Sequence, residues 1–143
     1  YESLTKDNVL ACKHMSDHWY HAQLNLGNVS VYKEKPGLNY MLDHFEELGL
    51  KGGVLFVGDE VVAFTIGEPM SEDTFHVHIE KAYSEVQGAY PMINQQFVLR
   101  EMQDFKYINR EEDDGVEGLR RAKESYRPVK MVKKYVATYV PEI

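Results

Sequence analysis

Residues 52–68 read GGVLFVGDEVVAFTIGE. Two runs rich in β-branched and aromatic residues, 54–57 and 61–66, flank Gly58-Asp59-Glu60, a combination typical of a tight turn. This stretch predicts a β-hairpin, and the remaining elements are placed around it.

A third strand with one polar face is predicted after the hairpin. Residues 74–80 alternate strictly between apolar and polar side chains. Side chains that alternate with a period of two point to opposite faces of a strand. We therefore expect His76, His78 and Glu80 to share one face.

Helices are predicted on both sides of these strands in the chain. Apolar residues recur at helical spacing, and cap or breaker residues bound the segments. The order helix, helix, hairpin, strand, helix, strand, helix, strand indicates an α+β fold. We expect a mixed, mostly antiparallel sheet with late β-α-β crossovers and helices on both faces. The expected elements are a helix over 5–24 capped by Thr5, a helix capped by Asn39 after the breaker Pro36-Gly37 and ended by Gly49, helices over 89–104 and 117–126, a short strand at 107–108 and a final alternating strand over 130–140.

The composition fits one globular domain from a reducing compartment. The chain has 143 residues, of which 43% are hydrophobic and 27% charged. Its single cysteine, Cys12, excludes an internal disulfide and favours a cytoplasmic location. We expect Cys12 to be a small buried apolar residue on a helix. No apolar run approaches the ~20 residues of a membrane span, so stable membrane insertion is not expected.

The charge of the chain is unevenly distributed. A net charge of −7 argues against a general nucleic-acid binder. Residues 119–135, however, carry seven basic side chains against Glu124 alone. A solvated helix face followed by a charged edge strand explains this cluster. The alternative is an anion site for a cofactor phosphate, a tRNA end or a lipid headgroup.

Four segments in combination carry a family resemblance: residues 52–68, HIEKA at 78–82, YINREEDDG at 107–115, and GLRRAKESY at 118–126 followed by Pro128. Together they resemble the bacterial phosphatidylglycerol lysyltransferase C-terminal-like family of the GNAT acyltransferase superfamily, which is related to the FemABX aminoacyltransferases. The resemblance implies a single GNAT-like domain over 1–143. It also implies that this domain is the second half of a tandem protein, so that the N-terminal GNAT-like half becomes an expected partner.

The resemblance also locates the donor site. GNAT proteins bind the donor pyrophosphate between the fourth strand and the following helix, where backbone N–H groups make an anion site. The matching residues are Gln87, Gly88, Ala89 and Tyr90. Their single glycine is a degenerate form of the glycine-containing signature. An acyl-CoA cofactor stays open, and an aminoacyl-tRNA donor or a lost donor site fits the degenerate form better.

The resemblance further implies three catalytic candidates. Acyl transfer to an amine needs a base, an oxyanion donor and an acid for the leaving group. Glu80 is expected to act as the base or to bind a substrate ammonium. Asn109 at the end of the fifth strand and Tyr126 in the next helix match GNAT positions, where the phenol protonates the leaving group. Polar groups on a half-solvated strand, and a tyrosine that closes the helix, are the structural alternatives.

Polar residues next to these positions are the expected substrate contacts. Two of them, His76 and His78, could also form a metal pair, but the sequence identifies no third ligand, so no metal site is predicted. A second histidine group, at 14, 18 and 21, recurs along the first helix and is interpreted as surface histidines. The expected substrate-binding residues are His76, His78, Glu111, Arg120 and Arg121.

Three functions remain open. The first is an acyl or aminoacyl transferase that delivers to an amine or hydroxyl acceptor, with Glu80, Asn109 and Tyr126 in its cleft and aminoacyl-tRNA as one candidate donor. The second is an acetyl-CoA-dependent N-acetyltransferase. The third is a non-catalytic GNAT-like half that binds substrate for the N-terminal domain. A shared fold does not choose among them.

Overall fold

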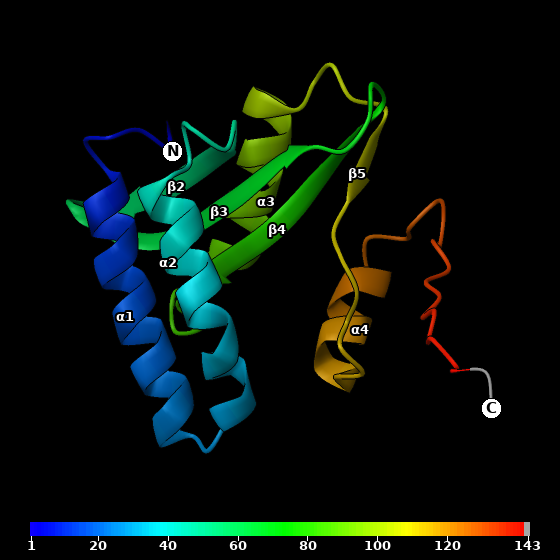
Figure 1. The fold of residues 1–143 in the computed structure, drawn as a ribbon. Coiled ribbons are helices and arrows are strands. Elements are labelled where there is room, and N and C mark those ends of the chain that lie inside the picture. The colour runs from blue at the N-terminus through cyan, green and yellow to red at the C-terminus, as the bar shows by residue number, and fades with distance from the viewer. Residues whose placement is uncertain (142–143) are drawn as a thin grey trace. The chain divides into compact units, whose positions relative to one another are not determined.

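The computed structural model describes residues 1–141, which form two compact units: Tyr1–Glu111, and a smaller unit that begins at Glu112. Figure 1 labels all of their helices and strands except β1 and η1. The first unit contains β1 (Glu2–Ser3), α1 (Val9–Asn25), the 3-10 helix η1 (Val29–Glu34), α2 (Lys35–Asp43), β2 (Lys51–Val57), β3 (Glu60–Pro69), β4 (Thr74–Ala82), α3 (Ala89–Glu101) and β5 (Tyr107–Asn109). In the second unit the helix α4 spans Glu117–Glu124.

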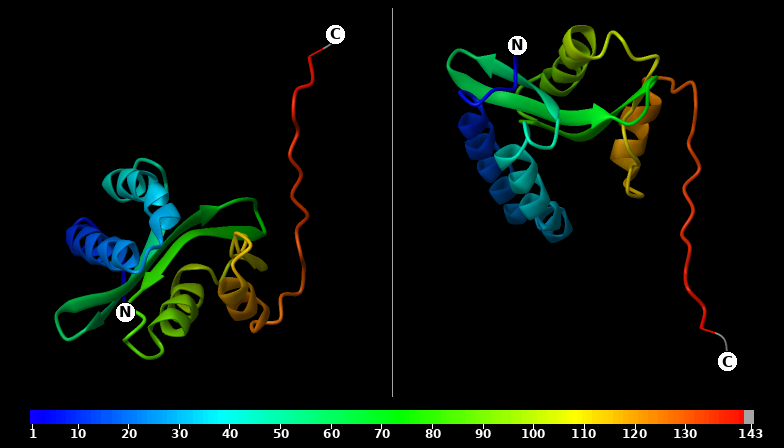
Figure 2. Two further views of the ribbon diagram at one scale, coloured as in Figure 1. Left: turned by 90° about the horizontal axis from the view of Figure 1, so that it is seen from below. Right: turned by 45° about the horizontal axis from the view of Figure 1, so that its top comes forward.

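The first unit is a five-stranded sheet with helices on both faces. Its strand order is β1-β2-β3-β4-β5, with antiparallel pairing from β1 to β4 and parallel pairing of β4 with β5. Figure 2 shows α1 and α2 against one face and α3 against the other. The predicted hairpin is β2–β3, and α3 is the helix of the predicted β-α-β crossover. The predicted α+β class is therefore confirmed.

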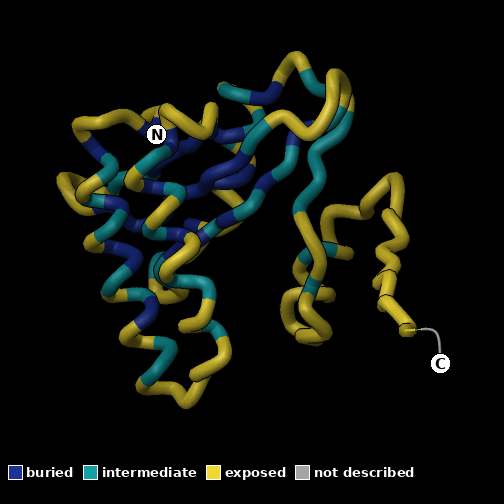
Figure 3. The backbone as a smooth tube through the Cα atoms, viewed as in Figure 1, coloured by how far each residue is buried: buried dark blue, intermediate teal, exposed yellow. Residues whose placement is uncertain are grey.

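Apolar side chains on the two faces of the sheet form the core. On the α1/α2 face the buried side chains include Tyr20, Leu38, Leu42 and Phe64. On the α3 face, Phe75 and Val77 of β4 pack against Phe97, and Ala63 and Ala82 pack against Ile93. Figure 3 shows that the buried positions of this unit lie mainly along the strands and the inner sides of the helices.

A β-bulge in β4 changes which face its side chains occupy. Ile66 of β3 pairs with Ile79 and Gly67 pairs with Val77, so His78 is the extra residue. As a result Val77 packs toward α3, whereas Ile79 belongs to the cluster on the α1/α2 face. The strict alternation predicted for this strand is therefore wrong. Glu80 lies on the α3 face, opposite the face that carries His76.

The first two helices begin differently from the prediction. Asn8, rather than Thr5, occupies the N-cap position of α1, and its side chain accepts a hydrogen bond from the Thr5 N–H (2.8 Å). Pro36 and Asn39 lie inside α2 instead of before it. Proline is tolerated in the first helical turn, because the N–H that it lacks would have no helical partner there. Gly49 has φ +67°, the left-handed conformation typical of a glycine that ends a helix.

The final predicted strand is wrong. Residues 127–141 form no helix or strand, and all of them are exposed. Alternation describes the two faces of a strand, but it does not determine whether another strand pairs with it. Within the described part of the chain, the sheet ends at β5 and this segment pairs with none of its strands.

Within residues 1–141, no helix combines the length and the apolar character needed to cross a bilayer.

Candidate functional site

The candidate site lies where β5 separates from β4. The two strands pair only from Thr74 to His76 on β4 and from Tyr107 to Asn109 on β5. After Asn109 the strand β5 ends, while β4 continues to Ala82. Polar residues at the end of the paired segment and beyond it form two clusters. The bulge at His78 separates them, so one cluster contains Glu80 and the other contains the two histidines.

The first cluster holds Glu80 between two protein donors. The side-chain amide of Asn94 on α3 donates to Glu80 Oε2 (3.1 Å), and Arg110 Nη2 donates to Glu80 Oε1 (2.9 Å). The Glu80 side chain is only 14% exposed. A carboxylate oxygen accepts more than one hydrogen bond, so Glu80 keeps acceptor capacity for a substrate N–H. Neither partner has a sequence signal, because nothing in the spacing of Asn94 or Arg110 relates them to Glu80.

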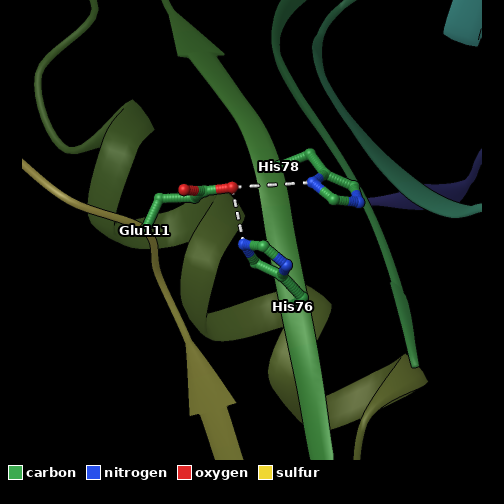
Figure 4. Close-up of side chains that lie close together, drawn as sticks. All are labelled: His76, His78 and Glu111. Atoms are coloured by element: carbon green, nitrogen blue, oxygen red, sulfur yellow. Dashed lines mark ion pairs between the residues drawn. The ribbon is translucent and has the colours of Figure 1, made fainter. Parts of the chain in front are cut away.

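The second cluster joins His76, His78 and Glu111 (Figure 4). Glu111 Oε1 lies 2.6 Å from His76 Nε2 and 3.6 Å from His78 Nδ1. The other ring nitrogen of His78, Nε2, is 2.8 Å from Glu68 Oε1 on β3. The two imidazole rings are 4.4 Å apart between centroids. Three of the five expected substrate contacts are therefore brought together, and Glu68 is an additional member that sequence reasoning does not identify.

The backbone of Glu111 is held in an unusual conformation by Asn109. Glu111 has φ +62°, a left-handed conformation that costs a residue with a side chain about 1 kcal/mol. Asn109 Oδ1 accepts a hydrogen bond from the Glu111 N–H (2.9 Å) and closes this turn. The described contact of Asn109 thus positions Glu111. Its predicted role as a catalytic group stays a prediction.

The donor atoms of this cluster lie close together. One atom each from His76, His78 and Glu111 all lie within 4.8 Å of one another. The sequence identifies no third ligand for the two histidines, whereas in the structure the turn after β5 supplies Glu111. Sequence spacing does not reveal this ligand, because Glu111 lies 33 residues after His78 and no motif connects them.

The expected donor site, at residues 87–90, borders a cavity of about 460 Å³ in the first unit. Gly88 precedes α3 in a left-handed conformation (φ +82°), and the N–H of Ala89 donates to Val86 O (3.1 Å). Tyr90 lines the cavity, as do Trp19, Tyr83 and the carboxylate-bearing Glu60 and Glu85.

The charge of this cavity is unusual for a phosphate site. No Lys or Arg is among the described residues that line it. Burial, followed by the negative charges of Glu60 and Glu85, raises the pKa of Tyr83. Burial also raises the pKa of Tyr90. Glu60 and Glu85 are both exposed, and their carboxylates give the lining of the cavity a negative charge.

The second unit carries the remaining candidates. Tyr126 lies just after α4 and is half exposed, and Arg120 and Arg121 are on α4. Arg120 Nε donates to Asp113 Oδ2 (2.6 Å), and the Arg120 guanidinium lowers the pKa of Asp113. Arg121 pairs with Glu117 (2.7 Å). Residues 112–141 contain seven basic and five acidic residues, so acidic neighbours in the sequence offset much of the charge of the basic cluster.

Comparisons with solved structures establish the fold. A conserved protein of unknown function from Bacteroides thetaiotaomicron is 43% identical, with a TM-score of 0.86 over 91% of this chain. This chain spans 44% of that protein's length. A ribosomal-protein-alanine N-acetyltransferase from Brucella melitensis aligns with a TM-score of 0.67 at 12% identity, over 96% of this chain and 98% of its own. An aminoglycoside acetyltransferase from an uncultured soil metagenomic sample aligns with a TM-score of 0.64 at 13% identity, over 99% of this chain and 95% of its own.

These similarities agree on a GNAT fold. No curated protein matches the chain. The family described as "Phosphatidylglycerol lysyltransferase, C-terminal" matches residues 1–138, which is nearly the whole chain. The resemblance inferred from the sequence segments is therefore confirmed, and the chain belongs to the phosphatidylglycerol lysyltransferase C-terminal family.

Proposed function

We propose that this domain transfers an aminoacyl group from an aminoacyl-tRNA to an amine or hydroxyl acceptor, as the C-terminal half of a tandem GNAT protein. Membership of a lysyltransferase family supports the reaction class. The tandem arrangement is supported by the related Bacteroides protein, of which this chain covers 44%. A cytoplasmic location is part of the proposal, because that is where aminoacyl-tRNA is made.

The acidic cavity beside the β4–α3 junction is the observation that carries this proposal. Acyl-CoA brings phosphates, which bind to cations and free N–H groups. The cavity instead presents Glu60 and Glu85 beside the rings of Trp19, Tyr83 and Tyr90. Carboxylates and aromatic rings attract a cationic group such as the lysyl side chain. The charge of the cavity therefore favours a cationic aminoacyl donor over acyl-CoA.

Glu80 supplies the acceptor side of the proposed reaction. Its carboxylate is fixed by Asn94 and Arg110 and keeps lone pairs for a substrate amine or hydroxyl. A fixed carboxylate orients the acceptor before it attacks the ester, and such positioning is a large part of acyl-transfer catalysis. We assign Glu80 to acceptor binding or proton removal.

Binding of charged and uncharged tRNA to the full-length protein tests the donor. Filter binding is expected to show tighter binding of lysyl-tRNA than of the same tRNA uncharged. The double variant Glu60→Gln, Glu85→Gln is expected to remove most of this difference, because it neutralises the cavity. A control variant, Glu47→Gln with Glu72→Gln, changes two exposed carboxylates outside the cavity. This variant should keep the difference in binding between lysyl-tRNA and uncharged tRNA.

Isothermal titration with acetyl-CoA tests the competing donor. No binding is expected at millimolar ligand, and a micromolar Kd would reject the aminoacyl proposal in favour of an N-acetyltransferase.

Charge reversal of Arg120, Arg121 and Lys123 to glutamate tests the second unit separately. Unchanged tRNA binding in that variant would reject a role for the basic cluster as an anion site.

A non-catalytic half is the second candidate function. The contacts of Glu80 favour it, since Asn94 and Arg110 also suit a purely structural carboxylate. The variants Glu80→Gln and Tyr126→Phe distinguish the two functions in the full-length protein. Unchanged transfer activity in both would support the non-catalytic role, and a loss of at least tenfold in Glu80→Gln would support catalysis here.

A further inference from the structure

We propose that His76, His78 and Glu111 bind one divalent transition-metal ion, with zinc the best match, and that Glu68 supports the site as an outer carboxylate. The proposal concerns the cluster on the side of β4 away from Glu80 and does not depend on the transferase reaction. Four observations carry it: the spacing of the donor atoms, their directions, the outer contact of His78, and the backbone that delivers Glu111.

The spacing of the donor atoms suits a single ion. Zinc bonds to His nitrogen and carboxylate oxygen are about 2.0–2.2 Å long, which puts two ligands of one tetrahedral ion about 3.3 Å apart. Glu111 Oε1 lies 2.6 Å from His76 Nε2 and 3.6 Å from His78 Nδ1, on either side of that value. All three donor atoms lie within 4.8 Å of one another, so small side-chain adjustments would bring them onto one ion.

The directions of these atoms also favour a shared ion over a direct bond. His76 Nε2 is buried and close to Glu111 Oε1, yet it makes no hydrogen bond within the described residues, because the ring N–H is not aligned with that oxygen. Such proximity without alignment is what two ligands of one ion show, since each directs its lone pair at the metal and not at the other ligand. In Figure 4, contacts from both imidazole rings converge on the same oxygen of Glu111.

Glu68 fixes which nitrogen of His78 is available. An ionised carboxylate only accepts hydrogen bonds, so the 2.8 Å contact places a proton on His78 Nε2. In the neutral ring the Nδ1 lone pair then faces Glu111 and is free to bind a cation. An outer carboxylate that holds the second nitrogen of a ligating histidine is a general feature of protein metal sites.

The backbone of the site is shaped at both ends. On β4 the bulge at His78 interrupts the alternation and brings both imidazoles toward Glu111. After β5 the left-handed conformation of Glu111, closed by Asn109, directs its carboxylate to them. A strained residue persists only where its surroundings hold it, and such residues concentrate at functional sites.

The ligand set identifies the class of ion. Two imidazoles and one carboxylate match zinc sites with one open position, and the same set serves iron(II) in other proteins. Magnesium and calcium prefer oxygen ligands and are not expected here. Three protein ligands leave at least one coordination position for water or a substrate oxygen.

Titration of the tag-free protein, stripped with chelator and dialysed, tests the site. Isothermal titration with zinc chloride is expected to show one ion per chain, and magnesium chloride should give no heat of binding. His76→Ala and His78→Ala should each abolish the zinc heat, and Glu111→Gln should weaken binding at least tenfold. Glu68→Gln should weaken it about 10–100-fold, as the loss of an outer-shell partner does.

His18→Ala is the matched control, because it removes one histidine from α1, where His14 and His21 also lie. Zinc binding that persists in His76→Ala but falls in His18→Ala would overturn the proposal, and so would no binding to the unsubstituted protein at micromolar zinc. Circular dichroism checks that each variant folds. If an alanine variant does not fold, the visible absorption spectrum of bound cobalt(II) tests the site instead. The unsubstituted protein should give the spectrum of tetrahedral cobalt(II), and folded Glu111→Gln should give an altered spectrum. An unaltered spectrum would reject the site.

Discussion

At the scale of single residues, Lys81 is a buried cation of the first unit that lies outside both candidate clusters. Only 8% of its surface is exposed. It forms an ion pair with Glu34 of η1 and lies 4.0 Å from the centroid of the Trp19 ring on α1. A buried ammonium is stable only when a carboxylate or aromatic face replaces its hydration. Lys81 therefore ties β4 to the two helical segments that cover this face.

Glu34→Gln should lower the free energy of unfolding by about 1–3 kcal/mol, the usual cost of a buried polar group that loses its partner. Urea unfolding followed by circular dichroism measures it. Glu46→Gln is the control: it breaks the exposed Lys6–Glu46 pair (2.7 Å), and such surface pairs contribute less than about 1 kcal/mol. Equal effects of the two substitutions would contradict the role assigned to Lys81.

Residue-level burial is easier to predict than residue-level function. The sequence predicts Cys12 as a buried helical residue, and it is fully buried, with burial raising the pKa of its thiol to about 12. His76, His78 and Glu111 are each predicted as substrate contacts, but their common contact is not. Periodicity reports the face of one element, and it carries no information on which side chain of a distant turn will reach that face.

At the scale of elements, the bulge between β3 and β4 decides where the polar side chains go. Gly67 pairs with Val77 beside the bulge. A Cβ atom at Gly67 would lie 2.2 Å from the backbone O of His76 and 2.6 Å from the Phe75 ring. Only glycine fits this close approach of two strands. The glycine is visible in the sequence, but an isolated glycine in a strand does not reveal which strand carries the extra residue.

Gly67→Ala should therefore destabilise the protein by about 1–3 kcal/mol, because the alanine methyl group must displace a backbone carbonyl. It should also weaken zinc binding, since the displaced residue is His76. Gly37→Ala in α2 is the control: a Cβ there meets nothing within 4 Å, and alanine favours a helix by up to about 1 kcal/mol. Thermal unfolding and zinc titration of both variants check the prediction, which fails if Gly67→Ala is neutral in both.

The pairing of α1 with α2 should depend on pH. Asp17 of α1 lies 2.6 Å from Lys35, the first residue of α2. The hydrogen bond from Lys35 lowers the pKa of Asp17, and the hydrogen bond to Asp17 raises that of Lys35. Because the pKa of Asp17 is lower in the folded protein, its carboxylate stabilises the fold at pH values above about 4, the pKa of an aspartate in the unfolded chain. This stabilisation is lost as the pH falls through the folded-state pKa. Because the pKa of Lys35 is higher in the folded protein, its ammonium group stabilises the fold at pH values below about 10.4. This stabilisation is lost as the pH rises through the folded-state pKa.

Asp17→Asn should accordingly cost less than about 1 kcal/mol at pH 7, as expected for a partly exposed pair. The difference from the unsubstituted protein should largely disappear at a pH low enough to protonate Asp17, where both proteins carry an uncharged side chain at this position. Denaturant unfolding at pH 7 and at successively lower pH measures this. A difference that grows as the pH falls would show that the ion pair is not its source.

At the scale of the whole molecule, the two units differ in what stabilises them. Among residues 1–141, three hydrophobic clusters are found, and all of their residues lie in the first unit, between Tyr1 and Ile108. In the second unit the described residues are mostly exposed, and ion pairs such as Arg120–Asp113 and Lys134–Glu112 are prominent among their contacts. Element order predicts the sheet and its covering helices well, because those depend on local periodicity. It fails for residues 130–140, where the sequence alternates but the structure forms no strand, because alternation does not determine whether a neighbouring strand pairs with the segment.

This difference predicts that residues 1–115 fold without the rest of the chain. The fragment keeps every member of the hydrophobic clusters, the Asn109–Glu111 turn and the four residues of the proposed zinc site. Because hydrophobic burial supplies most of the folding free energy, its cooperative unfolding should persist, with a midpoint within about 5 °C of that of the longer chain. Its zinc affinity should stay within about threefold of the longer chain's value, because every proposed ligand is retained.

Differential scanning calorimetry and zinc titration on both chains test this. A fragment without a cooperative transition would mean that the second unit stabilises the sheet, since the fragment already contains all three hydrophobic clusters. A folded fragment that has lost zinc binding would instead place a necessary ligand beyond residue 115. The two failures are distinguishable because calorimetry reports folding without reference to the metal, and the titration is interpreted only for a fragment that folds.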